Sequence, residues 1–346
     1  MEATHILQAG IRGLIEGENL TREQAKDIMG AIMEGIASPA QIGSLLTALR
    51  IKGETVDEIT GFAEAMRGFG THVVTETSQL LDTCGTGGSG ISKFNISTAS
   101  AIISSAASVR VAKHGNRSAT SKAGSADVLE ALGVNIHLNA EQAKQCLDKI
   151  GICFLFAQIY HPSMRHAAGP RRELGVRTVF NMLGPLTNPA GADRQLLGIY
   201  DRNKTETVAT VLRELGLKRA LVVSSLDGLD EISISAPTQV SELRNGIVTT
   251  YEVNPQELGL QMHPLEDVLG GDAAENAAII TSVLQGTLNP YRDIVLANAG
   301  ACIYVAGLAE TLADGVQKAK AVVDSGQALR KLEQLVSMTK ELNYVS

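Results

Sequence analysis

The sequence predicts an α/β protein with a small N-terminal all-helical domain and a large α/β domain built on a central, mostly parallel sheet. Helix-capping patterns recur ahead of apolar residues at helical spacing over the first 70 residues. From Leu80 onward, short apolar runs alternate with helical stretches, as in parallel sheets. We therefore expect a helical domain at residues 1–72, joined by helices near 163–190, and a large domain at residues 73–346.

The helical domain is predicted from three capping boxes, in which a Ser or Thr is followed three residues later by Gln or Glu. The pairs are Thr21 with Gln24, Ser38 with Gln41, and Thr55 with Glu58. Such side chains satisfy backbone N–H groups that a helix start leaves unpaired. With a further helix over residues 6–15, four short helices are expected. They carry no chemical motif, so we expect them to act as a scaffold or a subunit contact.

In the large domain, six apolar runs are candidate strands: residues 80–81, 109–112, 134–138, 152–156, 196–200 and 221–224. Helices are expected between them, for example over residues 127–132 and 140–150, which end at Gly133 and Gly151. The chain from Glu275 onward is mostly helix. Its uncharged run over residues 294–309 is too short for a membrane span and contains Asn298, which indicates a buried core helix.

Composition limits the partners. The formal net charge of −7 gives no overall basic field of the kind that binds nucleic acid. The four cysteines form no C-x-x-C pair and no zinc spacing, and the N-terminus has no signal-like segment. We therefore expect a cytoplasmic protein that engages neither nucleic acid nor a membrane. Its 346 residues are enough for a sizeable core.

A glycine loop at residues 82–90, Asp-Thr-Cys-Gly-Thr-Gly-Gly-Ser-Gly, lies between a candidate strand and a helix that begins near Asn95. Glycines allow backbone N–H groups to approach a ligand, and the start of a helix adds unpaired donors and a positive dipole end. A loop of this kind is by itself more often an ordinary tight turn. Its position ahead of a helix predicts a phosphate site.

Positive charge gathers around this loop. No carboxylate occurs between Asp82 and Asp127, whereas the interval contains Lys93, Arg110, Lys113, His114, Arg117 and Lys122. The segment 113–118, Lys-His-Gly-Asn-Arg-Ser, follows a candidate strand directly, at the end where α/β sheets place their ligands. Its cations and amide suit phosphate oxygens. His114 alone is more often a structural histidine.

Two further clusters bear on the chemistry. Residues 165–177 hold five cations, Arg165, His166, Arg171, Arg172 and Arg177, of which one arginine has the planar shape to clamp a carboxylate. Asp230 and Glu231 lie in a turn beyond a candidate strand. Adjacent carboxylates there usually face solvent, but a nearby pyrophosphate would favour a Mg²⁺ site.

Together these stretches resemble the anthranilate phosphoribosyltransferase family. The similar segments are residues 85–88, 94–98, 113–118, 124–127, 171–178, 181–189 and 230–231. The resemblance implies a nucleoside phosphorylase/phosphoribosyltransferase-like fold and transfer of the 5-phosphoribosyl group from phosphoribosyl pyrophosphate to the amine of anthranilate. The products would be N-(5-phosphoribosyl)anthranilate and pyrophosphate, in tryptophan biosynthesis. It also implies Mg²⁺ as cofactor and a homodimer formed through the N-terminal helices.

The resemblance assigns site residues by position. Substrate binding falls to Gly85, Gly88, Ser89, Lys93, Asn95, Ser97, Thr98, Lys113, His114, Gly115, Asn116, Arg117, Ser118, Ser125 and Arg171. Metal binding falls to Ser97, Asp230 and Glu231. Asn116 and Arg171 are expected to position anthranilate. No catalytic base is assigned, because an aromatic amine is already nucleophilic.

The chain departs from the family pattern at two positions. Ser89 stands where the family usually has aspartate in Gly-Thr-Gly-Gly-Asp-Gly, and Lys93 replaces a residue that is commonly small and polar. These two replacements leave open an altered activity or an altered choice of acceptor. Two alternatives remain as well: a pyrimidine nucleoside phosphorylase, and a non-catalytic, nucleic-acid-binding relative of the transferases.

Overall fold

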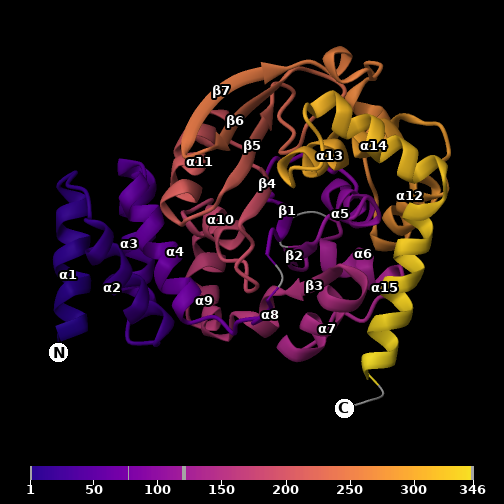
Figure 1. Cartoon of the computed structure of the whole chain (residues 1–346). Coiled ribbons are helices and arrows are strands. Elements are labelled where there is room, and N and C mark those ends of the chain that lie inside the picture. The colour runs from indigo at the N-terminus through magenta and orange to yellow at the C-terminus, as the bar shows by residue number, and fades with distance from the viewer. Residues whose placement is uncertain (1, 77, 119–121, 344–346) are drawn as a thin grey trace.

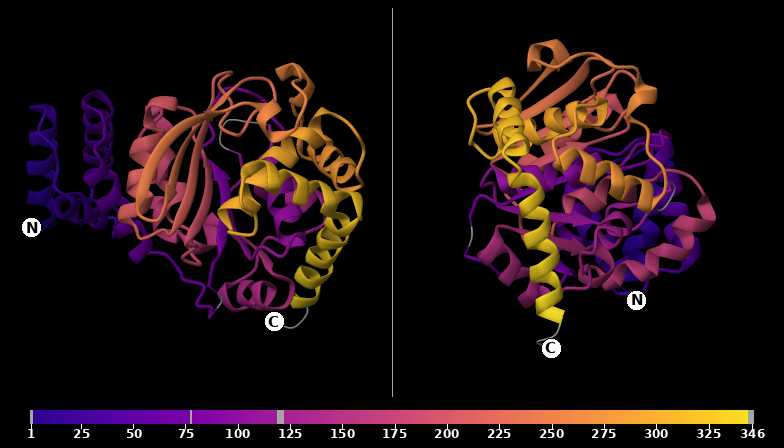
Figure 2. Two further views of the ribbon diagram at one scale, coloured as in Figure 1. Left: turned by 45° about the horizontal axis from the view of Figure 1, so that its top comes forward. Right: turned by 90° about the vertical axis from the view of Figure 1, so that its right-hand side faces the viewer.

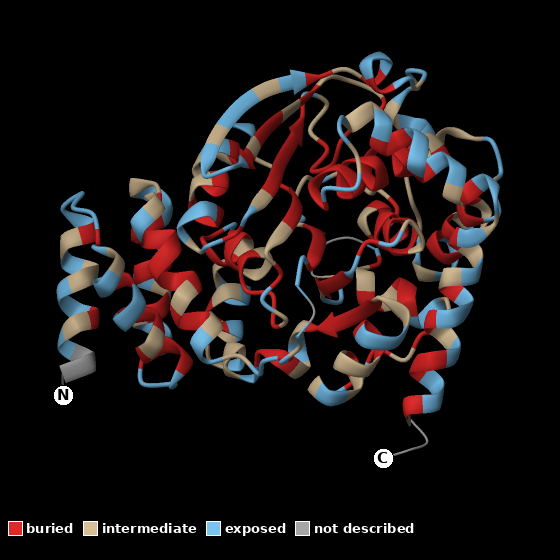
Figure 3. Cartoon of the chain, viewed as in Figure 1, coloured by how far each residue is buried: buried red, intermediate tan, exposed pale blue. Residues whose placement is uncertain are grey.

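The computed structural model describes residues 2–76, 78–118 and 122–343. Within those ranges it describes the side chains of residues 5–342. Four helices lie at one end of the molecule, a sheet lies at its centre, and the C-terminal helices cover the far side (Figure 1). A turned view shows the N-terminal helices extending away from the rest of the chain (Figure 2). The buried residues run from these helices into both sides of the sheet (Figure 3).

The N-terminal helices are α1 (Glu2–Ile15), α2 (Arg22–Met33), α3 (Pro39–Lys52) and α4 (Val56–Gly68). All three predicted capping boxes are confirmed, since each N-cap hydroxyl accepts from the backbone N–H three residues on, and each N-cap backbone N–H donates to the side chain of that same residue. Glu58 has a second role because it is fully buried, accepts from Leu20 N at 2.9 Å, and pairs with Lys52 at 2.9 Å. The capping residue of α4 therefore also fixes the α1–α2 connection.

The sheet has seven strands among the described residues, in the order β3-β2-β1-β4-β5-β6-β7. The strands are β1 (Leu81–Gly85), β2 (Val111–Gly115), β3 (Ile152–Phe156), β4 (Arg194–Gly198), β5 (Arg219–Ser225), β6 (Thr238–Arg244) and β7 (Ile247–Val253). Strands β1 to β5 pair in parallel, whereas β6 pairs antiparallel with both β5 and β7. The predicted mostly parallel α/β sheet is confirmed.

Two predictions about strands need correction. Residues 134–138 form no strand, although Val134, Ile136 and Leu138 are buried in the alternation that a strand would show. The backbone of this segment turns to side chains instead, with Asn135 N donating to Thr339 Oγ1 at 3.1 Å. In addition, the hairpin β6–β7 was missed. Its turn, Asn245-Gly246, has positive φ at both residues and is a recognised hairpin signal.

Helices cover both faces of the sheet. On one face lie α5 (Ile96–Ala106), α12 (Ala273–Leu284), α13 (Pro290–Val305), α14 (Leu312–Asp324) and α15 (Gln327–Asn343). On the other face, α11 (Thr205–Glu214) packs on β5, β6 and β7, and α7 (Ala140–Ile150) packs on β3. Neighbouring residues such as Leu196 and Leu197 enter different cores, as expected for a sheet buried on both sides.

The predicted helices of the large domain are present. Residues 127–132 correspond to α6 (Ser125–Ala131), and residues 140–150 coincide with α7. The predicted core helix is α13, in which the buried Asn298 side chain donates to Ile232 O at 2.8 Å. Among the described residues, no helix is long and apolar enough to cross a membrane.

Three short helices connect the N-terminal helices to the sheet: α8 (Ala157–Tyr160), α9 (Arg165–Leu174) and α10 (Phe180–Leu183). Helix α9 contacts α2 and α3, while α10 contacts α4. Ala167 and Phe180 belong to the same apolar core as the N-terminal helices and α11. These contacts link α9 and α10 to the N-terminal helices, while the expected domain division, with residues 163–190 joined to the helical domain, stays a prediction.

Candidate active site

The candidate site lies at the carboxyl ends of the parallel strands. Gly85 at the end of β1 pairs in register with Gly198 at the end of β4, and Thr86 N donates to Gly198 O at 2.9 Å. A Cβ at Gly198 would lie 1.9 Å from Asp230 O, and one at Gly85 would lie 2.8 Å from Asp230 Oδ2. Only glycine at these two strand ends lets the acidic segment pass this close to the sheet.

The acidic pair is deeply buried beside the glycine loop, with Asp230 fully buried and Glu231 only 3% exposed. Gly87 N donates to Asp230 Oδ2 at 3.2 Å, so the loop backbone contacts this carboxylate. Lys93 Nζ lies 2.9 Å from Asp230 Oδ1 and 2.9 Å from Glu231 Oε1, and it donates to Asp230 O at 3.2 Å. One ammonium therefore bridges both carboxylates.

Burial and charge act in opposite directions on these three groups. Burial raises the pKa of Asp230, but the charge and hydrogen bond of Lys93 outweigh it, so that the pKa lies below its ordinary value. Burial dominates at Glu231 and raises its pKa despite Lys93. Burial lowers the pKa of Lys93, but the two carboxylates more than offset this and leave it raised. Lys93 is therefore a cation fixed against an ionised Asp230.

A second buried lysine lies below the start of α5. Lys113 on β2 is 3% exposed, and its Nζ donates to Thr83 O at 2.6 Å and to Ser97 Oγ at 3.1 Å. Burial lowers the pKa of Lys113, partly offset by the charge of Asp82. Ser97 is in the first turn of α5, so this cation and the positive end of the helix dipole are close together.

The predicted metal ligands contact different lysines in the structure. Ser97 contacts Lys113, whereas Asp230 and Glu231 both contact Lys93. Within the described ranges, no group of three His, Cys, Asp or Glu side chains is placed to hold a metal ion. A divalent cation at the acidic pair does not fit while the Lys93 ammonium is there. The metal role of these residues stays a prediction.

Asn95 and Thr98 complete the start of α5. Asn95 makes no side-chain cap; its Nδ2 donates to Ala123 O at 3.2 Å, and its Oδ1 accepts from Asn276 Nδ2 at 3.0 Å. Thr98 Oγ1 is buried without a hydrogen-bond partner among the described residues. The sequence interpretation missed Asn276, because it lies 181 residues beyond Asn95 and carries no motif.

His114 is buried against another histidine. Its ring centroid lies 5.1 Å from that of His161, and the side chain is only 6% exposed. Burial, followed by the neighbouring His161, lowers the pKa of His114 to about 3. Its backbone N donates to Asp82 Oδ1 at 3.1 Å, and burial raises the pKa of that carboxyl to about 6. The imidazole is thus neutral at pH 7 and supplies no charge to a phosphate.

The loop after β2 is held by acidic residues of α6. Arg117 pairs with Asp127 at 2.8 Å and with Glu130 at 2.5 Å, so this predicted phosphate ligand contacts carboxylates in the structure. Ser118 N donates to Asp127 Oδ2 at 3.1 Å. Ser125 Oγ donates to Asn116 O at 3.3 Å, and Asn116 itself is exposed. Asn116, Ser118 and Ser125 are therefore placed together.

Arg171 lies on α9 and Arg177 follows that helix, and of the two Arg177 contacts the glycine loop. Arg171 on α9 is half-buried, lies over the Phe180 ring at 4.9 Å, and pairs with no carboxylate in the described part of the chain. Burial lowers its pKa. Arg177, which was not among the predicted site residues, donates to Gly88 O and lies 4.3 Å from the Tyr200 ring centroid. Its place in the arginine cluster was the available signal.

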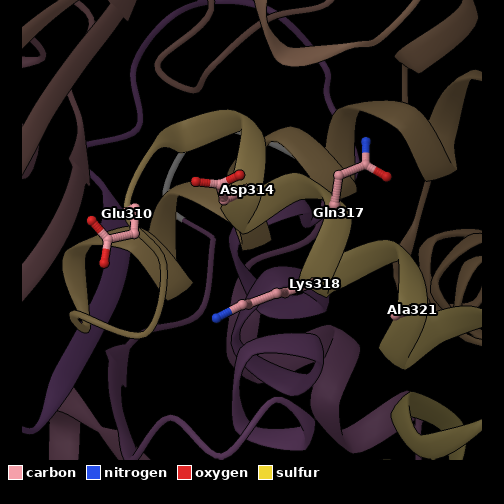
Figure 4. Close-up of a pocket in the computed structure, with 5 residues that line it drawn as sticks. All are labelled: Glu310, Asp314, Gln317, Lys318 and Ala321. Carbon is pink, nitrogen blue, oxygen red and sulfur yellow. The ribbon is translucent and has the colours of Figure 1, made fainter.

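Two surface hollows lie elsewhere. One, of about 400 Å³, is lined by Glu310, Asp314, Gln317, Lys318 and Ala321 along α14 (Figure 4). Another, of about 490 Å³, includes Arg110. This residue precedes β2 and so lies at the amino ends of the parallel strands, whereas the glycine loop lies at their carboxyl ends. The lining of neither hollow includes a predicted site residue.

The fold and this strand-end site define a transferase of the glycosyl transferase family. The model of that family's a/b domain matches residues 77–329, and the model of its helical bundle domain matches residues 8–70. The chain is 51% identical over 334 residues to anthranilate phosphoribosyltransferase of Acetivibrio thermocellus, covering 96% of this chain and 97% of that protein. It is 52% identical over 330 residues to the enzyme of Brevibacillus brevis, covering 95% and 97%.

Solved structures agree. Anthranilate phosphoribosyltransferase from Thermus thermophilus superposes with a TM-score of 0.91 at 43% identity, over 96% of this chain and 99% of that one. The Saccharomyces cerevisiae enzyme in complex with PRPP and Mg gives 0.88 at 27% identity, over 99% of both chains. The chain belongs to the anthranilate phosphoribosyltransferase family. The predicted family, fold and enzyme class are confirmed.

The buried His114 predicts a pH-dependent stability. Between pH 3 and 6.5 the unfolded chain binds more protons than the folded one, so the contribution of neutral His114 is complete above about pH 6.5 and is lost on acidification. Between pH 7 and pH 5, the unfolding free energy of the wild-type protein should therefore fall by about 2 kcal/mol more than that of His114→Gln. Urea unfolding at both pH values measures it, with the exposed His5→Gln as control. An unchanged pH dependence in His114→Gln would show that the ring is protonated in the native state.

Proposed function

We propose that the chain transfers the 5-phosphoribosyl group of phosphoribosyl pyrophosphate to the amine of anthranilate, which gives N-(5-phosphoribosyl)anthranilate and pyrophosphate in tryptophan biosynthesis. One observation carries the proposal: the glycine loop after β1, the start of α5 and the buried Lys113 meet at one edge of a parallel sheet. Such an edge is where α/β sheets bind ligands, and its charge suits phosphate. The relatives named for this activity support it.

The donor would bind along the glycine loop and the start of α5. Backbone donors at Gly85, Gly88 and Ser89, the Asn95 amide and the hydroxyls of Ser97 and Thr98 form one wall. Lys113 contributes positive charge from below, and residues 115–118 with Ser125 form the facing loop. Arg117 would reach a phosphate only by leaving Asp127 and Glu130, so we assign it to positioning this loop.

Mg²⁺ would accompany the pyrophosphate. The yeast neighbour was solved in complex with PRPP and Mg, and a polyphosphate-bound Mg²⁺ takes most of its ligands from phosphate and water. Such an ion offsets negative charge on the leaving pyrophosphate. Among the predicted metal residues, Ser97 is the one that does not contact Lys93, since its hydroxyl accepts from Lys113.

Anthranilate would bind between Arg171 and the loop after β2. Arg171 is a half-buried guanidinium with no acidic partner in the described ranges, which suits the substrate carboxylate. Asn116, exposed on the facing loop, would orient the ring and amine. The yeast neighbour in complex with 4-fluoroanthranilate, a close analogue of this acceptor, supports such a site in the same fold.

In the transfer, the amine nitrogen forms a bond to ribose C1 as the bond from C1 to the pyrophosphate oxygen breaks, and the nitrogen then loses one proton to water or to the released pyrophosphate. Positive charge develops at C1 and negative charge on the leaving group. The loop N–H groups and Lys113 are fixed before the reaction and stabilise the growing negative charge. Positioning of the amine supplies much of the remaining acceleration. No residue of this chain is needed as a strong base, which agrees with the buried, neutral His114.

We further propose a homodimer that associates through the N-terminal helices. Three large apolar side chains in that region are exposed, Ile15 at 71%, Ile36 at 47% and Ile51 at 82%. The helices extend away from the rest of the chain, which leaves their outer surface accessible (Figure 2). A cytoplasmic location suits the four cysteines, all of which are buried free thiols.

The activity is tested by following the fluorescence of anthranilate. We expect its consumption to require both phosphoribosyl pyrophosphate and Mg²⁺. A phosphorylase of the same fold would instead cleave thymidine in the presence of inorganic phosphate. Cleavage of thymidine without consumption of anthranilate would overturn the proposed reaction, and a gel shift with single-stranded DNA but no turnover would favour the non-catalytic alternative.

Arg171 is expected to set the affinity for anthranilate. Because a charged hydrogen bond contributes about 1.5–3 kcal/mol, Arg171→Ala should raise the KM for anthranilate by roughly 10- to 100-fold. The KM for phosphoribosyl pyrophosphate should hardly change. The neighbouring Arg172→Ala, an exposed residue on the same helix, is the matched control and should behave as wild type. Equal effects of Arg171→Ala on both KM values would place Arg171 elsewhere in the mechanism.

The proposed dimer interface is tested at Ile51. A charge in an apolar interface weakens it, so Ile51→Glu should shift the protein from twice the 36.5 kDa chain mass towards a single chain in analytical ultracentrifugation. Leu288→Glu changes a residue of 83% exposure in the large domain and should leave the mass unchanged. A wild-type monomer, or an undisturbed dimer in Ile51→Glu, would argue against this surface.

A further inference from the structure

The two positions at which the chain departs from its family pattern meet at one carboxylate. Lys93 Nζ lies 2.9 Å from Asp230 Oδ1. Burial raises the pKa of Asp230 and Lys93 lowers it most, with a smaller lowering from the Ser89 side chain. In the sequence these positions look like separate replacements on either side of a loop. In the structure, one removes a negative charge beside the acidic pair and the other adds a positive charge to it.

We propose that the Lys93 ammonium is a built-in cation that takes the place of a divalent metal ion at Asp230 and Glu231. It donates hydrogen bonds to Asp230 O and Glu231 Oε1, and its nitrogen also lies at ion-pair distance, 2.9 Å, from Asp230 Oδ1. The side chain of Lys93 is 17% exposed, and those of the two acids are 1% and 4% exposed. The ammonium is thus enclosed by oxygen atoms, as a bound cation would be.

The placement of Lys93 is fixed by its own backbone as well as by the acids. It forms an isolated antiparallel bridge with Leu269, and Gly270 N donates to Ser92 O at 2.7 Å. The next residue, Phe94, is fully buried against Tyr291. Both ends of the contact are therefore anchored, since Asp230 is itself held against Gly87 and Gly198.

Charge balance explains why ammonium and metal ion exclude one another here. Two buried carboxylates need compensating positive charge, and removal of a partner leaves an uncompensated charge at high cost. Lys93 supplies one such positive charge permanently. A divalent ion that entered the same space would face an ammonium at contact distance, so the resting protein should hold no metal at this pair. The proposed Mg²⁺ that arrives with pyrophosphate is a separate ion.

Metal binding to the substrate-free protein tests the inference independently of the proposed reaction. Mn²⁺ is the probe, titrated in the absence of substrate and followed by its electron paramagnetic resonance signal. We expect only weak binding to wild type and a new site in Lys93→Ser that is at least roughly tenfold tighter, because two carboxylates become available to a hard cation. The exposed Lys218→Ser removes the same charge from a distant turn and should match wild type.

The double variant Lys93→Ser/Asp230→Asn assigns the new site, since it should return Mn²⁺ binding to the wild-type level. Equal Mn²⁺ affinity in wild type and Lys93→Ser would overturn the inference. If Lys93→Ser does not fold, crystals of the wild-type protein soaked in Mn²⁺ decide the question. An anomalous peak between Asp230 and Glu231 would refute the built-in cation, and its absence there beside an unmoved Lys93 would support it.

Discussion

The close passage of the Asp230 backbone across the ends of β1 and β4 is the constraint on which the site depends. It requires hydrogen atoms in place of side chains at Gly85 and Gly198, which are paired in register. Once Asp230 lies there, its carboxylate contacts the glycine loop, and the following Glu231 is enclosed as well. The position of the glycine loop and the burial of the two carboxylates thus both follow from the close passage at Gly85 and Gly198.

Buried charges of this kind are stable only when they are paired and hydrogen-bonded. The sheet edge contains two such sets. Lys93 contacts both Asp230 and Glu231 with its single positive charge, while Lys113 lies near Asp82 and donates to Thr83 O and Ser97 Oγ. In the first set, Lys93 is paired with two acids, whereas in the second, Lys113 contacts Ser97 at the start of α5. Positive potential towards a ligand therefore comes mainly from Lys113 and the α5 helix terminus.

Local patterns were sufficient to predict much of the fold. Capping boxes fixed the N-terminal helices, and β3 coincides with the apolar run at 152–156, because these signals depend on residues close in sequence. The segment 134–138 was misread because its backbone N–H at Asn135 donates to the Thr339 side chain on α15 rather than to a neighbouring strand. The missed hairpin had a local signal, Asn245-Gly246, that was not used.

The site was predictable as a set of segments but not as a set of contacts. Family-like motifs placed the glycine loop, Lys113 and the acidic pair at one sheet edge. The sequence did not predict that Arg117 would turn to Asp127, that His114 would be buried against His161, or that Lys93 would reach residues 137 and 138 positions away. Each of these depends on which oppositely charged or apolar group the tertiary fold brings nearest, and that choice has no sequence signature.

The proposed acceptor site depends on a different part of the molecule from the donor site. Arg171 is on α9, which packs against α2 and α3, whereas the phosphate loop and Lys113 belong to the sheet. The two units meet through α4 against α11 and α10, and through Arg177, which joins Gly88 to Tyr200. The distance from a carboxylate at Arg171 to a ribose at the loop is thus set by helix packing rather than by the sheet. In the proposed reaction, the N-terminal helices would therefore determine the alignment of amine and C1, even though they carry no reacting group.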